Sequence, residues 1–201
     1  MKKRTIIAIV IAVLLIFLFA GGCSSYNGLV TADQAVQTQW GQVENQYQRR
    51  ADLIPNLVST VKGYASHESS TLQNVTDARA GLSQAYNAAN EIPADSAQAN
   101  IEQYQAAQSK LKSALDIYVN AVHEAYPELK ANTNFLSLQA QLESTENRIS
   151  TERKRYNEVV QTYNNKVLRF PGNIWASIFS FQAKPMFKAD EGAQHAPKVE
   201  F

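Results

Sequence analysis

The chain has three histidines, the side chain that most often serves as a general base near neutral pH: His67, His123 and His195. The first stands between Ser66 and Glu68, which are residue types of a hydrolytic triad. Adjacent residues on a helix point in different directions, so these three side chains would not meet. Neither His67 nor His123 has a glutamate three residues before it, as di-iron helical bundles do. We therefore predict no catalytic residue, no metal site, no cofactor and no enzymatic activity.

Cys23 is the only cysteine, which excludes a disulfide within the chain and any site that needs several cysteines. It follows a basic start, an apolar stretch at residues 6–20 and two glycines, an order typical of a signal segment. The small residues before it resemble the bacterial lipobox, although a typical lipobox has leucine where Ala20 stands. We predict cleavage before Cys23 and lipid attachment at this residue. The alternative is an uncleaved signal anchor, continuous with the next helix, in which the thiol is idle.

Both interpretations of the N-terminus place the rest of the chain outside the cytoplasm. Lys2, Lys3 and Arg4 form a short basic stub, which stays inside under the positive-inside rule. In a cell with two membranes, Ser24 favours the outer membrane by analogy with known sorting signals. We expect a bacterial cell-envelope protein attached to a membrane through its N-terminus, either lipid-anchored or single-pass.

The composition is that of a folded domain without a basic surface for nucleic acid. Hydrophobic residues make up 45% of the chain and charged residues 18%. The net charge is +1, and removing the three basic residues of the stub leaves +1 − 3 = −2 for the rest. We expect one folded domain and no nucleic-acid partner.

From Leu29 onward, apolar residues recur three and four positions apart, the spacing of helices that face a core. A mean spacing of about 3.5 residues favours neighbouring helices packed nearly antiparallel. We predict an all-α fold, an antiparallel up-and-down four-helix bundle with helices at 27–51, 53–91, 96–126 and 133–169. A continuous, kinked helix through Pro55 is the alternative to the first of these breaks.

The chain divides into four expected parts: a signal peptide or signal anchor at 1–22, a lipidated tether at 23–28, the helical domain at 29–187 and a polar flexible tail at 188–201. The domain ends in an apolar cluster of Ile174, Trp175, Ile178, Phe179, Phe181, Met186 and Phe187. We expect this cluster to cover the open end of the bundle. The alternative is a segment on the membrane surface, where aromatic residues are favoured.

Charged residues interrupt the apolar seams of the expected helices. When the spacing is carried through, Arg50 falls in the first seam, Glu68 and Arg79 in the second, and Glu152 in the fourth. A buried charge is costly unless it is paired and hydrogen-bonded. We expect these side chains to form a buried ion-pair seam or to extend to its rim. A polar ligand pocket inside the bundle is the alternative.

Several short segments resemble the LemA family: Tyr26–Val30 (YNGLV), Gln46–Val58 (QYQRRADLIPNLV), Val61–Ala65 (VKGYA), Glu146–Ile149 (ENRI), Arg155–Asn157 (RYN) and Phe170–Gly172 (FPG). The resemblance extends from residue 26 to near residue 187. It implies an up-and-down four-helix bundle that is anchored by an N-terminal membrane segment and lies outside the cytoplasm. It supplies neither catalytic residues nor a biochemical activity.

The resemblance also suggests a partner in the envelope, because relatives are often encoded beside TPM-domain membrane proteins. Our first hypothesis is a non-enzymatic scaffold or adaptor that presents helix faces to a protein partner. The alternative is a module that binds an envelope ligand, such as a lipid or a peptidoglycan fragment. An unsatisfied cleft around Glu68, Arg79 and Glu152 would favour the ligand, and a sealed core with a large exposed apolar stripe would favour the adaptor.

Overall fold

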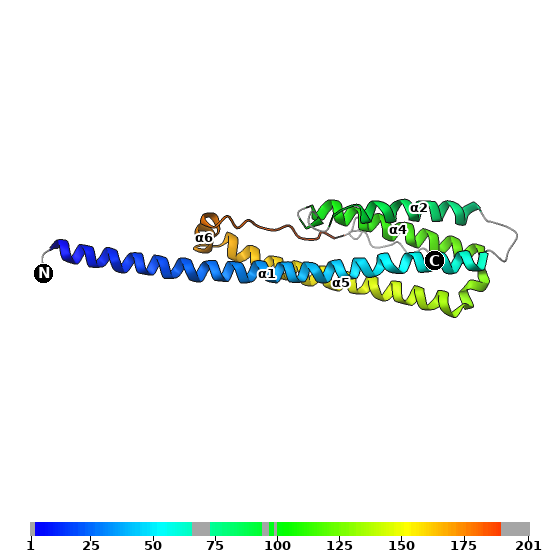
Figure 1. The fold of residues 1–201 in the computed structure, drawn as a ribbon, viewed down its shortest axis with the longest axis horizontal. Helices are drawn as coiled ribbons and strands as arrows, with labels where there is room; N and C mark the ends of the chain where they lie inside the picture. Colours follow the sequence, from blue (N-terminus) through cyan, green and yellow to red (C-terminus); the bar gives the residue numbers. More distant parts are fainter. Residues whose placement is uncertain (1–2, 66–72, 94–96, 99, 190–201) are drawn as a thin grey trace, which may run out of the picture. The chain divides into compact units, whose positions relative to one another are not determined.

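The computed structural model describes residues 3–65, 73–93, 97–98 and 100–189, and within these ranges the chain is all-helical. The elements are α1 (Lys3–Ala65), α2 (Gln73–Asn90), α4 (Ile101–Ala125), a short 3-10 helix η1 (Pro127–Ala131), α5 (Thr133–Leu168) and α6 (Gly172–Ile178) (Figure 1). The predicted all-α class is confirmed. The up-and-down order of a four-helix bundle stays a prediction.

The chain forms two compact units. The first consists of Met1–Gln39 and Arg155–Lys184, and the second of Trp40–Lys154 and Pro185–Phe201. The long helices α1 and α5 therefore each contribute one part to the first unit and the other part to the second.

The predicted helix break around Pro55 is wrong, because α1 continues through this proline to Ala65. A proline inside a helix removes one backbone hydrogen bond and disfavours the helix locally. Leu53, Ile54 and Leu57 around it are all buried in the core, whereas Pro55 itself is exposed. Packing on both sides of the proline thus outweighs its local effect. The continuous helix, the alternative considered above, is the one observed.

The later helix boundaries lie close to the predicted ones, with one exception. The helix expected at 53–91 corresponds to the last part of α1, which ends at Ala65, and to α2, which begins at Gln73; residues 66–72 lie outside the described part of the chain. The start of α5 has a clear local cause. The side-chain Oδ1 of Asn132 accepts hydrogen bonds from the backbone N–H groups of Asn134 (3.0 Å) and Phe135 (3.1 Å), which caps the helix.

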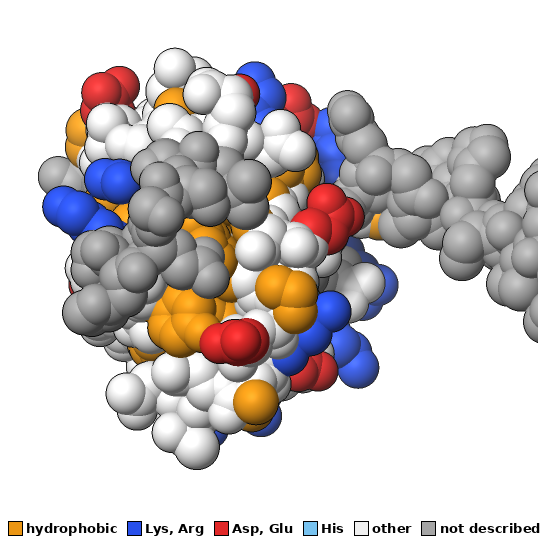
Figure 2. Space-filling model, turned by 90° about the vertical axis from the view of Figure 1, so that its right-hand side faces the viewer, with side chains coloured by type: hydrophobic (Ala, Val, Ile, Leu, Met, Phe, Trp, Pro, Cys, Tyr) orange, Lys and Arg blue, Asp and Glu red, His pale blue; other side chains and the backbone are white. Residues whose placement is uncertain are grey.

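The second unit has an apolar core to which all of its helices contribute. The helices α2 and α4 lie side by side in it (Figure 1). Figure 2 shows hydrophobic side chains in the middle of one face, with charged side chains around them. Buried residues recur every seven positions: Val43, Arg50 and Leu57 on α1; Val75, Leu82 and Ala89 on α2; Ile101, Gln108, Leu115 and Val122 on α4; Phe135, Leu142 and Ile149 on α5.

The first unit joins α1 to the second half of α5 and to the chain that returns after α6. Its buried residues include Leu29 and Val36 of α1 and Tyr156, Val160, Tyr163 and Val167 of α5. The Tyr163 hydroxyl donates to the backbone oxygen of Gln182 at 2.9 Å. The Asn164 side chain holds both the backbone oxygen and the backbone N–H of Lys184, at 2.9 and 2.8 Å. The Lys184 ammonium lies 2.6 Å from the carboxylate of Asp33.

Gly172 follows the turn at Phe170-Pro171 and begins α6. A Cβ atom at this position would lie 2.3 Å from the backbone oxygen of Lys166, a distance that no side chain can occupy. The backbone of α5 therefore approaches Gly172 so closely that only glycine fits. This contact gives the Phe-Pro-Gly segment a structural role.

Replacing Pro55 with alanine should stabilise the second unit. Alanine restores the missing N–H donor and removes no buried contact, so we expect the free energy of unfolding to rise by about 1–3 kcal/mol. Urea unfolding followed by circular dichroism in detergent measures the change. Ser59→Ala, at an exposed position one turn later on α1, is the matched control and should change stability by no more than about 0.5 kcal/mol. A Pro55→Ala protein that is less stable than the wild type would show that the proline has a structural role of its own.

Candidate functional site

Arg50 of α1 is the only charged side chain that is buried among the described residues, and it is 2% exposed. Its Nη1 donates to Oε1 of Glu146 on α5 at 2.7 Å. Its Nη2 donates to the backbone oxygen of Gln108 on α4 at 3.3 Å, and also to the Oε1 of the same glutamine. One guanidinium thus connects three helices of the second unit.

The environment of Arg50 compensates most of its charge. The guanidinium carbon lies 5.2 Å from the centre of the Tyr47 ring, within the range of a cation–π interaction. Glu146 keeps 23% of its side chain exposed, so its carboxylate remains in contact with water. The Arg50 Nε has no hydrogen-bond partner in the described part of the chain. Because the planar guanidinium needs acceptors at fixed angles, this cluster defines how the three helices align along their axes.

Of the four predicted seam residues, Arg50 forms a buried ion pair, and its partner Glu146 is a residue that the spacing did not select. Arg79 is exposed and Glu152 is half-buried, whereas Glu68 lies outside the described residues. Val75 and Leu82 are buried as the seam requires, but between them the partly buried position is Ala78, and Arg79 next to it points to solvent. Glu146 follows Thr145, a buried position of α5, and its long side chain reaches back to Arg50.

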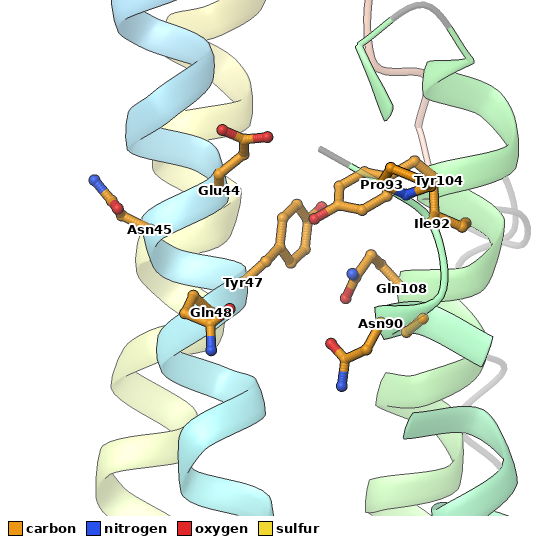
Figure 3. Close-up of a pocket in the computed structure, with 10 residues that line it drawn as sticks. Glu44, Asn45, Tyr47, Gln48, Asn90, Ile92, Pro93, Tyr104 and Gln108 are labelled. Carbon is orange, nitrogen blue, oxygen red and sulfur yellow. The ribbon is translucent and has the colours of Figure 1, made fainter. Parts of the chain in front are cut away.

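A cavity of about 410 Å³ lies beside this cluster, between α1 and the region where α2 ends and α4 begins. In Figure 3 the ring of Tyr47 points from α1 toward Tyr104 of α4, and Gln108 and Asn90 lie next to them. The two tyrosine rings meet edge to face, with their centres 5.3 Å apart. Burial, then the neighbouring Tyr47 and Glu44, raise the pKa of the Tyr104 hydroxyl above its usual range, so Tyr104 stays protonated at neutral pH.

The chemistry of this cavity is that of polar recognition. Its lining offers hydroxyl, amide and carboxylate groups and no histidine or cysteine. Over the described ranges, no group of three metal-binding side chains comes together. His123 makes packing and hydrogen-bond contacts within the domain: its Nε2 lies 3.1 Å from the Gln139 amide nitrogen, and its ring packs against Phe135. His67 and His195 lie outside the described residues.

An open apolar groove lies between α2 and α4 in the second unit, with a volume of about 450 Å³. Small residues form its floor: Ala78 and Gly81 of α2, and Ala114 and Ala121 of α4. Ile117 stands in it with 61% of its surface exposed. A Cβ atom at Gly81 would meet nothing within 4 Å, so the groove is open at this point.

The tail segment after Lys184 is attached to the second unit by Phe187 and Lys188. The Phe187 ring is buried, stacks on Trp40 at 5.9 Å and lies under the Arg153 guanidinium at 5.0 Å. The backbone oxygen of Lys188 accepts hydrogen bonds from Gln105 and Arg153, both at 2.9 Å. Lys188, expected as the start of the flexible tail, is therefore held in place, and the later tail residues from 190 on lie outside the described part.

The apolar cluster of the tail does not bury itself as a cap. Phe187 is buried, but Ile174, Ile178 and Phe179 remain among the exposed large hydrophobic residues. We expected this cluster to cover the open end of the bundle. The exposure of Ile174 and Ile178 in α6, and of Phe179 directly after it, is inconsistent with that expectation for these three residues. Their exposed side chains can contact an apolar environment outside the chain.

Cys23 is exposed on α1, inside a helix that continues on both sides of it. It lines a second, mostly apolar cavity of about 420 Å³ in the first unit, together with Phe19, Tyr26, Trp175 and Phe179. The N-terminal part of α1 is long and apolar enough to cross a membrane, a property that a signal sequence near the N-terminus shares. This apolar helix indicates association with a membrane.

The ion pair of Arg50 and Glu146 should be essential for the stability of the second unit. Glu146→Ala leaves the buried guanidinium without its counter-ion, so we expect a loss of about 3–5 kcal/mol. Glu143→Ala, an exposed position on the same helix, should change stability by less than about 0.5 kcal/mol. The double variant Arg50→Met/Glu146→Leu should recover much of the loss, because it removes both charges together. Equal melting of Glu146→Ala and Glu143→Ala would contradict a buried pair.

Comparison with known proteins places this chain in a family. Residues 39–201, well over half of the chain, match the LemA family. A LemA protein of Metamycoplasma hominis is 24% identical over 168 residues, which are 82% of this chain and 69% of that protein. The magnetosome proteins MamQ 1 and MamQ 2 of Paramagnetospirillum magneticum are each 28% identical over 181 residues, which are 81% of this chain but only 64% of theirs. The extent of the family match shows that the chain belongs to the LemA family.

Proposed function

We propose that this LemA-family protein is a non-enzymatic adaptor, anchored in a bacterial envelope membrane, that binds a helix of a partner protein in the groove between α2 and α4. The observation that carries the proposal is the open apolar groove around Gly81 and Ile117. None of the names of its relatives states a reaction. The partner class that the family resemblance suggests is a TPM-domain membrane protein.

The chemistry of the groove fits a helix better than a small molecule. A helix presents ridges of side chains, and a floor of small residues such as Ala78 and Ala114 lets such a ridge come close to both helix backbones. Ile117 supplies apolar contact at one side of the groove. An amphipathic helix would cover this surface and leave its own polar face in water.

Gly81 supports the same interpretation. Glycine inside a helix is less favourable than alanine by about 1 kcal/mol. No neighbouring atom in the described part of the unit limits the space at Gly81. The same is true of Gly41 and Gly63 of α1, but Gly81 differs from them because it lines the apolar groove. The close approach of a partner helix to this groove would explain a glycine at position 81.

The membrane attachment is proposed to be the N-terminal helix itself, retained as a single-pass anchor with the rest of the chain outside the cytoplasm. The packing of Trp175 against Gly22 supports retention, because cleavage before Cys23 would remove that contact. The mass of the mature protein distinguishes the two anchors, since cleavage and acylation at Cys23 would remove the first 22 residues and add lipid.

A second candidate function is binding of a polar envelope ligand in the cavity beside Arg50. The observation in its favour is the lining of the cavity, where Tyr47, Tyr104 and Gln108 offer hydrogen-bonding groups next to aromatic rings. A peptidoglycan fragment, which carries sugar hydroxyls and amides, fits this lining better than a lipid chain does. A small molecule that co-purifies with the protein would support this candidate.

Photo-crosslinking in intact cells tests the adaptor function. A photoreactive amino acid at position 117 should give one defined adduct with a membrane protein, and the crosslinked peptide should map to a helix of that protein. The same amino acid at position 143, exposed on α5, should not give this adduct. Adducts that do not differ between the two positions would contradict the proposal.

Filling the groove should remove the partner. Gly81→Leu places a side chain where the partner helix would lie, and we expect the adduct yield to fall about tenfold or more, which corresponds to about 1.4 kcal/mol. Gly63→Leu is the matched control, because this exposed glycine of α1 also has nothing within 4 Å of its would-be Cβ. Equal yields from the two variants would show that the groove is not the docking site.

A further inference from the structure

Three aromatic residues of the first unit lie against α1 just after its apolar segment, next to Tyr26 of α1 itself. We refer to Tyr26, Trp175, Phe179 and Phe181 as the aromatic collar. The Tyr26 ring meets Phe179 with ring centres 4.8 Å apart and Phe181 at 6.1 Å. Trp175 stacks on Phe179 at 6.3 Å. Residues far apart in the sequence thus form one cluster.

The collar depends on a close contact with Gly22. A Cβ atom at Gly22 would lie 2.8 Å from the indole ring of Trp175, so the ring rests directly on the helix backbone. Gly22 is buried by this contact, although the residues of α1 described before it are exposed. The indole therefore covers α1 where α1 itself has no side chain.

The surface around the collar is apolar and uncovered. Phe170 is 80% exposed, Ile178 61% and Ile174 49%, and Phe19 on α1 is exposed as well. Single exposed apolar residues are common on soluble proteins and need no explanation. A group of large exposed apolar side chains is less common and often marks a surface that binds a partner or a membrane. Burial of these side chains in lipid would be favourable.

The length of the apolar segment of α1, compared with the thickness of a bilayer, suggests what the aromatic collar contributes. Residues 6–20, the most apolar part of α1, rise by about 1.5 Å each and cover about 22 Å of a hydrocarbon core of about 30 Å, so a spanning α1 places the residues next to this segment in the core as well. The next residues of α1 are Gly21, Gly22, Cys23 and two serines, which offer little apolar surface. Trp175 and Phe179 lie at this stretch and supply the apolar surface that α1 lacks.

We propose that the aromatic collar and α6 lie in the interfacial layer of the membrane that α1 enters, with bilayer lipids as their binding partner. Tryptophan and tyrosine favour this layer, because their rings combine an apolar body with a polar edge. Arg169, exposed just after the end of α5, provides a cation for phosphate headgroups, and the exposed Lys166 ammonium, which donates to the backbone oxygen of Gly28 at 3.2 Å, adds positive charge beside it. The proposal rests on the membrane anchor that the proposed function assumes, and adds a second contact with the same membrane.

The two tryptophans of the chain, Trp40 and Trp175, allow a direct test. The full-length protein is reconstituted in vesicles of phosphatidylcholine and phosphatidylglycerol that contain phosphatidylcholine brominated in the upper part of its acyl chains. In the Trp40→Phe variant, fluorescence comes from Trp175 alone, and we expect the brominated lipid to quench it by about half or more, as for an interfacial ring. In the Trp175→Phe variant, fluorescence comes from Trp40, which is buried in the second unit, and quenching should be much weaker.

Each outcome of this test has a distinct meaning. If Trp40→Phe does not fold, the difference between the wild type and Trp175→Phe gives the same quantity. Equal quenching of both tryptophans, in protein that floats with the vesicles, overturns the collar proposal and leaves the anchor intact. Protein that does not float with the vesicles overturns the proposed anchor together with the collar.

Discussion

A guanidinium inside an apolar core fixes how three helices of the second unit, α1, α4 and α5, align with one another. Arg50 is tolerated there only because Glu146, Gln108 and Tyr47 reach it at once, from two other helices and from its own. Sliding any of these helices by one turn would move an acceptor by about 5.4 Å and leave the charge unpaired. Apolar contacts tolerate small shifts in register, whereas this cluster does not. The alignment of α1 with α4 and α5, on which the cavity beside Arg50 depends, therefore follows from one buried charge.

The helices themselves could be predicted well from the sequence, because the apolar spacing is regular and Asn132 marks the start of α5. Two features could not. Pro55 is a strong local signal for a break, but tertiary packing of Leu53, Ile54 and Leu57 overrules it. Arg50 was placed in a seam by its spacing, but its partner Glu146 lies beside the seam, and the reach of a long side chain is not visible in a periodic pattern.

The first unit shows a different limit. The apolar segment near the N-terminus is evident from composition, and the aromatic residues near the C-terminus are evident as a cluster. Their contact through Gly22 and Trp175 is not, because a glycine gives no signal of what lies on it. The sequence left two alternatives for the aromatic cluster, a bundle cap and a membrane-surface segment. The exposure of Ile174 and Ile178 favours the second, since a cap would bury them.

Contacts within the chain explain the glycines at two positions, Gly172 and Gly22, but not the glycine at position 81. Gly172 is required by the backbone oxygen of Lys166, and Gly22 by the indole of Trp175, so contacts within the chain account for both. Gly81 has no such neighbour among the described residues, and it lies in the middle of α2, where alanine would be more favourable. Gly63 of α1 has equally open surroundings, so open space alone does not distinguish Gly81; its place in the apolar groove with Ala78 and Ala114 does. This groove is the surface on which the proposed partner helix would bind, and a glycine there would let that helix come close to the backbone of α2.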